Sequence, residues 1–175
     1  PRWRPGRRLA AHDLRTGARR RMISEDDYRL RDAVTDDLPW LDELRRRAYA
    51  ELFVSTWGGW DEERHRRHFR AFVEAGSASI IEASDGTRLG VVQVTEDART
   101  LEIAEIQIDP TYQGRGIGTT VLRDVISRAE SEGRAVHLRV GIRNEGAIRL
   151  YERLGFEAVG ESETHLKMRR GASGA

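Results

Sequence analysis

Residues 113–118, with the sequence Gln-Gly-Arg-Gly-Ile-Gly, form the stretch whose residue types and spacing are best suited to chemistry. Glycine lacks a Cβ, so Gly114, Gly116 and Gly118 let the main chain come close to a ligand. From Ile117 onward the apolar residues recur at helical spacing, which predicts that the loop opens a helix. The first turn of a helix has spare N–H donors and the positive end of a dipole. The sequence therefore predicts an anion site that suits phosphate; a purely structural turn is the alternative.

Two common phosphate loops do not fit this stretch. A Walker loop ends in Gly-Lys-Ser or Gly-Lys-Thr, whereas Gly118 is followed by two threonines and no lysine. A dinucleotide fingerprint needs its third glycine at the position of Thr119, and it usually lies in the first unit of a fold. The present loop lies beyond the middle of the chain.

The elements that must position this loop follow from apolar periodicity and turn residues. Helices are predicted from the cap residue Thr35 to the break at Gly58-Gly59, and then at 61–75, 117–133 and 145–154. Strands are predicted at residues 28–34, 79–82, 89–95, 100–108, 136–140, 156–160 and 164–168. This order predicts an α/β sandwich in which helices flank a mixed sheet.

Composition narrows the class of protein. The chain has 175 residues, of which 38% are hydrophobic and 34% charged, so we expect one rather polar globular domain. No apolar run approaches the roughly 18 residues of a membrane span, and no membrane partner is expected. Because the sequence contains no cysteine, disulfides and cysteine nucleophiles are excluded. A cytoplasmic location is the expectation.

Charge is unevenly distributed. Residues 1–21 contain eight arginines and one acid, which leaves 22 of the 30 basic and 28 of the 29 acidic residues for the remainder. We interpret 1–21 as a basic, disordered arm, 22–170 as one domain and 171–175 as a frayed tail. Nucleic acid is not an expected partner of the domain, and only the arm would suit it.

The motifs resemble the GNAT superfamily of acyl-CoA-dependent N-acetyltransferases. The family's loop motif matches at Gln113, Gly116 and Gly118. A second match begins 26 positions after Gly118, at Asn144, and continues with Ala147, Leu150-Tyr151 and Leu154-Gly155-Phe156. The resemblance covers residues 29–168 and implies a GNAT-like sandwich with a central mixed, mostly antiparallel sheet.

The resemblance also implies acetyl-CoA as cosubstrate. The loop amides would hold its pyrophosphate, and the fourth strand would pair with its pantetheine arm through backbone groups. Asn144 would contact the same arm, although asparagine also suits a turn before a helix. The predicted coenzyme A-binding residues are Ile106, Gln107, Ile108, Gln113, Gly114, Arg115, Gly116, Ile117, Gly118, Thr119, Asn144 and Tyr151. No metal is expected, because His65 and His68 have no third ligand in view.

Catalytic candidates come from the same resemblance. Tyr151 resembles the family's proton-donating tyrosine; the alternative is a ring packed against the sheet. In one pattern of the family, the catalytic base is a glutamate in the fifth strand, but this sequence has Arg139 there. The remaining candidates are on the fourth strand, with Glu105 as the base and Glu102 in reserve. Either could instead be an exposed acid or an ion-pair partner.

The faces of the fourth strand bear on that choice. Strict alternation would put Glu102 with Ile106 and Ile108, and Glu105 with Ile103 and Gln107, unless a bulge shifts the parity. We expect a carboxylate among apolar neighbours at position 105 to be partly buried and more basic.

The acceptor is expected to be a small-molecule or peptide amine. Phe53, Trp57 and Trp60 lie where the family builds its acceptor pocket, and core packing is the alternative for them. A homodimer is possible in this family. Two other functions stay open: a non-catalytic coenzyme A-binding module, and a GNAT acting on an RNA-linked amine.

Overall fold

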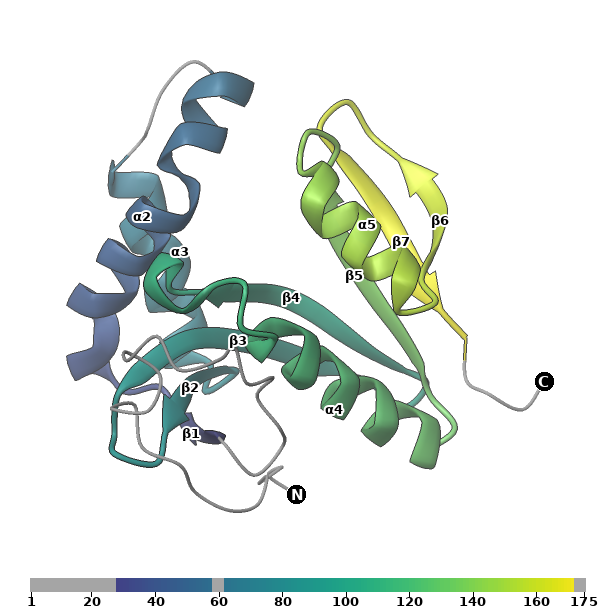
Figure 1. The fold of residues 1–175 in the computed structure, drawn as a ribbon, viewed down its shortest axis with the longest axis horizontal. Helices are drawn as coiled ribbons and strands as arrows, with labels where there is room; N and C mark the ends of the chain where they lie inside the picture. Colours follow the sequence, from purple (N-terminus) through teal and green to yellow (C-terminus); the bar gives the residue numbers. More distant parts are fainter. Residues whose placement is uncertain (1–27, 58–61, 172–175) are drawn as a thin grey trace.

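The computed structural model describes residues 28–57 and 62–171, which form a seven-stranded sheet with helices on both faces (Figure 1). The strand order is β1-β2-β3-β4-β5-β7-β6. The strands are β1 (Tyr28–Asp32), β2 (Ala78–Ala83), β3 (Arg88–Glu96), β4 (Thr100–Ile108), β5 (Ala135–Gly141), β6 (Glu157–Glu161) and β7 (His165–Arg170). The helices are α2 (Leu38–Trp57), α3 (Glu62–Glu74), α4 (Ile117–Ser131) and α5 (Glu145–Arg153). The mixed, mostly antiparallel sandwich predicted from the sequence is confirmed.

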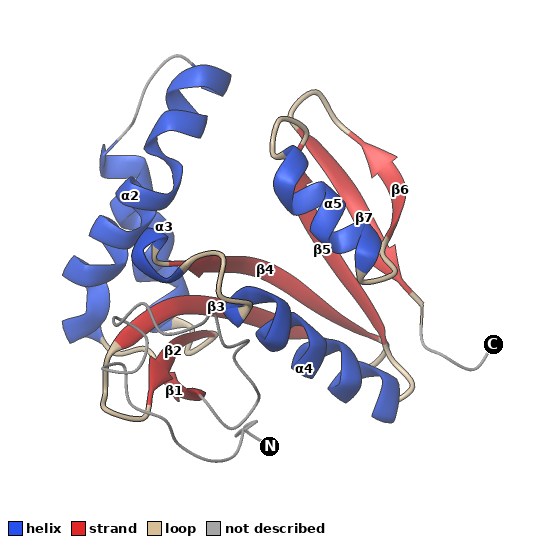
Figure 2. Cartoon of the chain, viewed as in Figure 1, coloured by secondary structure: helices blue, strands red, loops and turns tan. Residues whose placement is uncertain are grey.

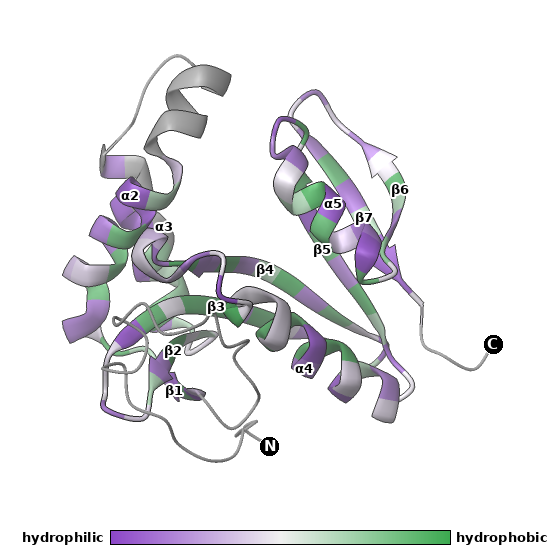
Figure 3. Cartoon of the chain, in the orientation of Figure 1, coloured by the Kyte–Doolittle hydropathy of each residue, from purple (hydrophilic) through white to green (hydrophobic). Residues whose placement is uncertain are grey.

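The core is divided by the sheet into two layers (Figure 2). On one face α4 and α5 pack against the sheet, around residues such as Leu101, Leu122 and Leu138. On the other face α2 and α3 cover β1, β2 and β3, with Leu41, Leu44 and Phe69 buried between them and the strands. Strand residues alternate between these layers, as Figure 3 shows in the alternation of apolar and polar positions along β4.

Helix α4 shows how the sequence pattern becomes packing. Its predicted apolar stripe is buried throughout: Ile117, Val121, Leu122, Val125, Ile126 and Ala129. A stripe of this width fixes the rotation of the helix about its own axis, because burial of each large apolar side chain contributes about 1.5–3 kcal/mol. The start of α4, and with it the glycine loop, is therefore held against the end of β4.

The two halves of the sheet separate beside that loop. Strands β4 and β5 run parallel and pair only from Thr100 with Ala135 to Ile103 with Leu138. Beyond these residues the strands diverge, as Figure 1 shows. The second half of β4 therefore has a backbone edge that no residue of β5 occupies, and a strand-like ligand could pair with it.

A bulge in β4 changes which side chains share a face. Gln93 of β3 pairs with Glu105 and Val94 pairs with Ile103, so Ala104 is an extra residue on β4. Leu101 and Ile103 pack in the α4 layer, and Ile106 packs there too. Strict alternation is thus wrong across the bulge. Glu105 does not share a face with Ile103, but it does share a face with Gln107.

Most predicted boundaries lie within two residues of the observed ones. The first strand is shorter than predicted, because residues 35–37 form a 3-10 turn before α2. The backbone N–H of Val34 donates to Oδ2 of Asp37 at 3.0 Å, so Asp37 caps this start and Thr35 does not. The predicted arm 1–21, residues 172–175 of the predicted tail 171–175, and residue 61 at the predicted start of the second helix lie outside the described residues.

Candidate active site

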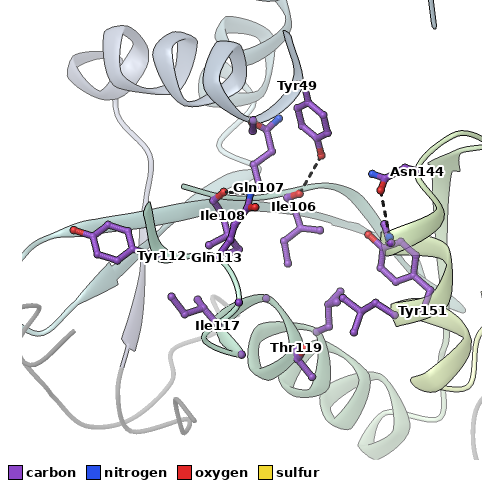
Figure 4. A pocket seen from close by; sticks show the side chains of 18 residues that line it. Tyr49, Ile106, Gln107, Ile108, Tyr112, Gln113, Ile117, Thr119, Asn144 and Tyr151 are labelled. Atoms are coloured by element: carbon purple, nitrogen blue, oxygen red, sulfur yellow. Dashed lines mark hydrogen bonds between the residues drawn. The ribbon is translucent and has the colours of Figure 1, made fainter. Parts of the chain in front are cut away.

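A cavity of about 530 Å³ lies where β4 and β5 diverge (Figure 4). Its walls come from the end of β4, the glycine loop, the first turns of α4, the start of α5 and the middle of α2. Eleven of the twelve predicted coenzyme A-binding residues line it; Arg115 is the exception. The structure therefore brings together two motifs that lie 26 positions apart in the sequence.

The glycine loop presents bare backbone to this cavity. Gly114 and Gly116 have φ angles of 70° and 86°, in the left-handed region that favours glycine. Within the described part of the chain, the amides of Gly114, Arg115 and Gly116 donate to no protein acceptor. The amides of the first α4 turn add to these unpaired donors. This arrangement suits an anion with several oxygens.

The two polar side chains of the loop, Gln113 and Arg115, both donate hydrogen bonds to backbone carbonyls. The amide nitrogen of Gln113 donates to the carbonyl of Ile108 at 3.0 Å, which fixes the loop to the end of β4. Arg115 donates to the carbonyl of Thr111 at 3.3 Å and lies over the ring of Tyr112. Its guanidinium is thus engaged with the preceding turn, so the loop's anion preference rests on main-chain groups.

Asn144 and Tyr151 both come from α5. The carbonyl oxygen of the Asn144 side chain accepts from the amide of Ala147 at 3.2 Å, which caps the helix. The capping role that the sequence offered as the alternative is thus present, and Asn144 lines the cavity as well. Tyr151 packs its ring edge-on to Phe156, with ring centroids 5.8 Å apart.

The Tyr151 hydroxyl keeps its proton over a wide pH range. Burial raises the pKa of this phenol to about 12, and the negative charge of Glu105 adds to the shift. Tyr151 is therefore a protonated donor at neutral pH, close enough to Glu105 for the carboxylate to influence it.

Glu105 and Glu102 have different surroundings. Oε2 of Glu105 lies 2.8 Å from Nη1 of Arg45 on α2, and the two side chains are 12% and 10% exposed. Glu102 is 44% exposed and lies 3.8 Å from Arg139, itself 65% exposed. The ion-pair alternative that the sequence offered is therefore present at both sites. Of these two glutamates, only Glu105 is enclosed, and its side chain is paired with Arg45.

The comparisons with known proteins bear on the same region. The family model described as the acetyltransferase (GNAT) family matches residues 41–156, about two thirds of the chain. The chain belongs to the GNAT acetyltransferase family. The match includes β4, the glycine loop and the α5 residues that line the cavity.

Two relatives and one solved structure place this GNAT chain among its neighbours. It is 31% identical over 145 residues to an uncharacterized N-acetyltransferase of Methanocaldococcus jannaschii, covering 74% of this chain and 61% of that protein. It is 40% identical over 81 residues to the N-alpha-acetyltransferase RimI of Mycobacterium tuberculosis, covering 44% and 50%. The spermidine N-acetyltransferase of Vibrio cholerae, solved with CoA and spermine, has a TM-score of 0.63 at 20% identity, covering 84% and 96%.

The chain spans between a quarter and about three fifths of the first curated relatives it matches, with shares of 61%, 50% and 24%. The similarity to the solved structure, at 20% identity, establishes the fold alone.

Helix α2 of this GNAT chain supplies residues that the sequence patterns did not single out. Tyr49 lines the cavity, and its hydroxyl donates to the carbonyl of Ile106 at 3.5 Å (Figure 4). Burial raises the pKa of Tyr49 well above its usual value, and the charge of Glu105 raises it further. Arg45 precedes Tyr49 by four residues, so both project from one helix face. That spacing was the only available signal, and it did not reveal that this face meets β4.

Some predicted features cannot be placed. Trp60 lies outside the described residues, as do the side chains of Phe53, Trp57, His65 and His68. Over residues 28–57 and 62–171, no group of three or more His, Cys, Asp or Glu residues is arranged to hold a metal ion. None of the helices in that same range is long and apolar enough to cross a membrane.

Proposed function

We propose that this GNAT-family chain transfers an acetyl group from acetyl-CoA to a primary amine, by direct attack of the amine on the thioester. The observation that carries the proposal is the cavity, in which unpaired loop amides face the free edge of β4 and the Tyr151 hydroxyl. The chain has no cysteine, so no cysteine can carry the acetyl group.

Coenzyme A fits the groups that line this cavity. Its pyrophosphate suits the amides of residues 114–119 at the start of α4. Its pantetheine arm carries amides, which suit the edge of β4 that β5 leaves uncovered beyond Ile103. A structural neighbour, the Vibrio cholerae spermidine N-acetyltransferase, was solved with CoA. These three observations support acetyl-CoA as the cosubstrate.

The reaction can be balanced with this chain's own side chains. The neutral amine nitrogen attacks the thioester carbonyl carbon, and the carbonyl oxygen gains charge that a free N–H of β4 can stabilise. The C–S bond then breaks, and the departing thiolate takes a proton from the Tyr151 hydroxyl. The proton lost by the amine passes to Glu105, directly or through water, and its return to the Tyr151 phenolate restores both side chains. Acetylated amine and free coenzyme A thiol are the products.

The acceptor amine lies within a broad class. The name of the Mycobacterium tuberculosis relative indicates an N-alpha amine, and the Vibrio cholerae enzyme acts on spermidine. Both are primary amines, and we propose a primary amine for this chain on that basis.

A thiol-release assay tests the proposal. The purified chain is incubated with acetyl-CoA and a panel of amines that includes alanine-initiated peptides, lysine peptides and spermidine, and free coenzyme A is measured. We expect release that depends on both acetyl-CoA and one class of amine. Binding of acetyl-CoA without release with any amine would favour a non-catalytic coenzyme A-binding module and overturn the catalytic proposal.

A further inference from the structure

The proposed base, Glu105, lies behind the wall of the cavity. Its side chain is only 12% exposed, and Glu105 is not among the residues that line the cavity. A general base must lie within hydrogen-bond reach of the proton that it removes, or be joined to it by one intervening group. The group that lies between the cavity and Glu105 therefore decides how the proton of the amine travels.

Tyr49 has contacts on both sides of this gap. It lines the cavity, and its hydroxyl lies 3.5 Å from the carbonyl oxygen of Ile106, the residue that follows Glu105 on β4. A hydrogen bond also links the hydroxyl to the Glu105 carboxylate. Figure 4 shows Tyr49 directed at β4 from α2, with Tyr151 on the opposite wall of the cavity. The Tyr49 hydroxyl thus lies between the cavity and the proposed base.

Arg45 holds the tyrosine and the glutamate together. Its Nη1 atom lies 2.8 Å from Oε2 of Glu105, and its guanidinium lies 5.8 Å from the centroid of the Tyr49 ring. The second distance is within cation–π range. Arg45 and Tyr49 are four residues apart on α2, so they project from one face of the helix. The hydroxyl and the carboxylate are therefore kept close to each other, as transfer of a proton between them requires.

The protonation state of Tyr49 suits a relay and not a final proton acceptor. Burial raises the pKa of this phenol well above its usual value, and the nearby charge of Glu105 raises it further. The phenol therefore keeps its proton at neutral pH and does not act as a base by itself. A protonated hydroxyl has both a lone pair and a proton, so it can accept one proton while it gives up another.

We propose that Tyr49 is a further catalytic residue, whose hydroxyl relays the proton of the acceptor amine to Glu105. As the amine nitrogen bonds to the acetyl carbon, its N–H bond breaks and that proton binds the Tyr49 oxygen. In the same step the original O–H bond of Tyr49 breaks, and its proton binds the Glu105 carboxylate. Tyr49 is neutral before and after, and Glu105 gains one proton. The inference rests on the proposed acetyl transfer with Glu105 as base, and it specifies the route to that base.

The test replaces Tyr49 with Phe, which keeps the ring that packs against Arg45 and removes only the hydroxyl. Single-turnover acetyl transfer is measured with the amine of the panel that gives the fastest thiol release. We expect the rate constant to fall by about tenfold or more, while the affinity for acetyl-CoA changes by no more than about twofold. The relay moves two protons in one step, so deuterated water should slow the unmodified chain more than it slows Tyr49→Phe.

Tyr28 provides a matched control away from the cavity. It is also buried, its hydroxyl also bonds a carboxylate, that of Asp124, and neither residue lines the cavity. Tyr28→Phe should leave the transfer rate and its solvent isotope effect unchanged even if stability falls. A transfer rate for Tyr49→Phe equal to that of Tyr28→Phe would overturn the inference. So would a slower transfer whose solvent isotope effect is the same as in the unmodified chain, because that result indicates a structural loss.

Glu105→Gln separates the relay from the proposed function. Residues that act as one unit have non-additive effects, so the double variant Tyr49→Phe/Glu105→Gln should be no slower than the slower single variant. Effects that multiply would overturn the relay and leave Glu105 as the base. An unchanged rate in Glu105→Gln would instead count against the base assigned in the proposed function, and against the relay with it. The comparison of Tyr49→Phe with Tyr28→Phe decides the case if Glu105→Gln fails to fold.

Discussion

Two residues beside the cavity, Tyr151 and Glu105, have different surroundings. Tyr151 is buried against Phe156 and near a negative charge, so its neutral form is favoured. Glu105 is largely buried and lies 2.8 Å from the Arg45 guanidinium. The surroundings of Tyr151 therefore keep its hydroxyl protonated, as the proposed role of proton donor requires.

Replacing Tyr151 with Phe should separate chemistry from binding. Loss of a general acid typically costs 10²- to 10⁴-fold in rate, so we expect kcat to fall by about a hundredfold or more. The ring contact with Phe156 is retained, and the KM for acetyl-CoA should change by no more than about twofold. Steady-state kinetics with acetyl-CoA varied measure both quantities. An unchanged kcat would exclude Tyr151 as the acid.

The glycine loop illustrates a constraint at the scale of an element. Gly116 immediately precedes α4, has a left-handed φ and lines the cavity. A side chain at such a φ costs about 1–2 kcal/mol and would also narrow the approach to the main chain. The same backbone angle occurs at Gly86, in the turn between β2 and β3, where no ligand is expected.

Gly116→Ala and Gly86→Ala should therefore lose similar amounts of stability but differ in function. Their φ angles are 86° and 85°, and an added Cβ at Gly86 meets no atom within 4 Å. We expect each to lower the free energy of unfolding by about 1–2 kcal/mol. Only Gly116→Ala should weaken coenzyme A binding, by tenfold or more, in a calorimetric titration. Equal affinities for the two variants would contradict the loop's proposed role.

Asp37 joins β1, the 3-10 turn and β3 at the other end of the sheet. Arg31 donates to it twice, at 2.7 and 2.8 Å, and Arg88 adds a contact at 3.3 Å. The pKa of the Asp37 carboxyl lies below its usual value of 3.8, mainly because Arg31 donates hydrogen bonds to it. Because the folded state lowers this pKa, the stabilisation is present above about pH 4 and is lost as the pH falls through the folded value.

Asp37→Asn should lower the free energy of unfolding at pH 7 by about 1–3 kcal/mol, a modest value because the partner arginines are about one third exposed. Urea titrations at pH 7 and pH 3 should show that the variant loses less stability on acidification than the unmodified chain does. Parallel losses in the two proteins would show that Asp37 does not contribute to the acid sensitivity.

At the scale of the whole molecule, the cavity lies where the two halves of the sheet diverge. The two halves of the sheet share only four residue pairs between β4 and β5. A ligand that contacts β4, α4 and α5 together would bridge this division. Binding of this kind stabilises the folded state in proportion to the logarithm of ligand concentration.

Coenzyme A at about 100 times its dissociation constant should add about 2.7 kcal/mol of stability. For a domain of this size that corresponds to a rise in Tm of roughly 5–10 °C. Thermal denaturation with increasing coenzyme A measures the shift, and adenosine alone serves as the control without pyrophosphate. A Tm that does not respond to coenzyme A would contradict the proposed site.

The sequence by itself determined the elements and the loop, because these depend on local features. The apolar spacing of 117–129 fixed α4, and the three glycines from Gly114 to Gly118 indicated backbone close to an anion. The family motifs at Gln113 and Asn144 located the two walls of the cavity, although not the distance between them.

Only the tertiary structure decided how α2 meets β4. One extra residue, Ala104, reverses the alternation of the strand and turns Glu105 towards Arg45, sixty positions earlier in the chain. Contacts between residues so far apart depend on bulges and helix rotation that no local pattern records. These contacts, which the sequence does not reveal, place the Arg45 guanidinium beside Glu105, the proposed base.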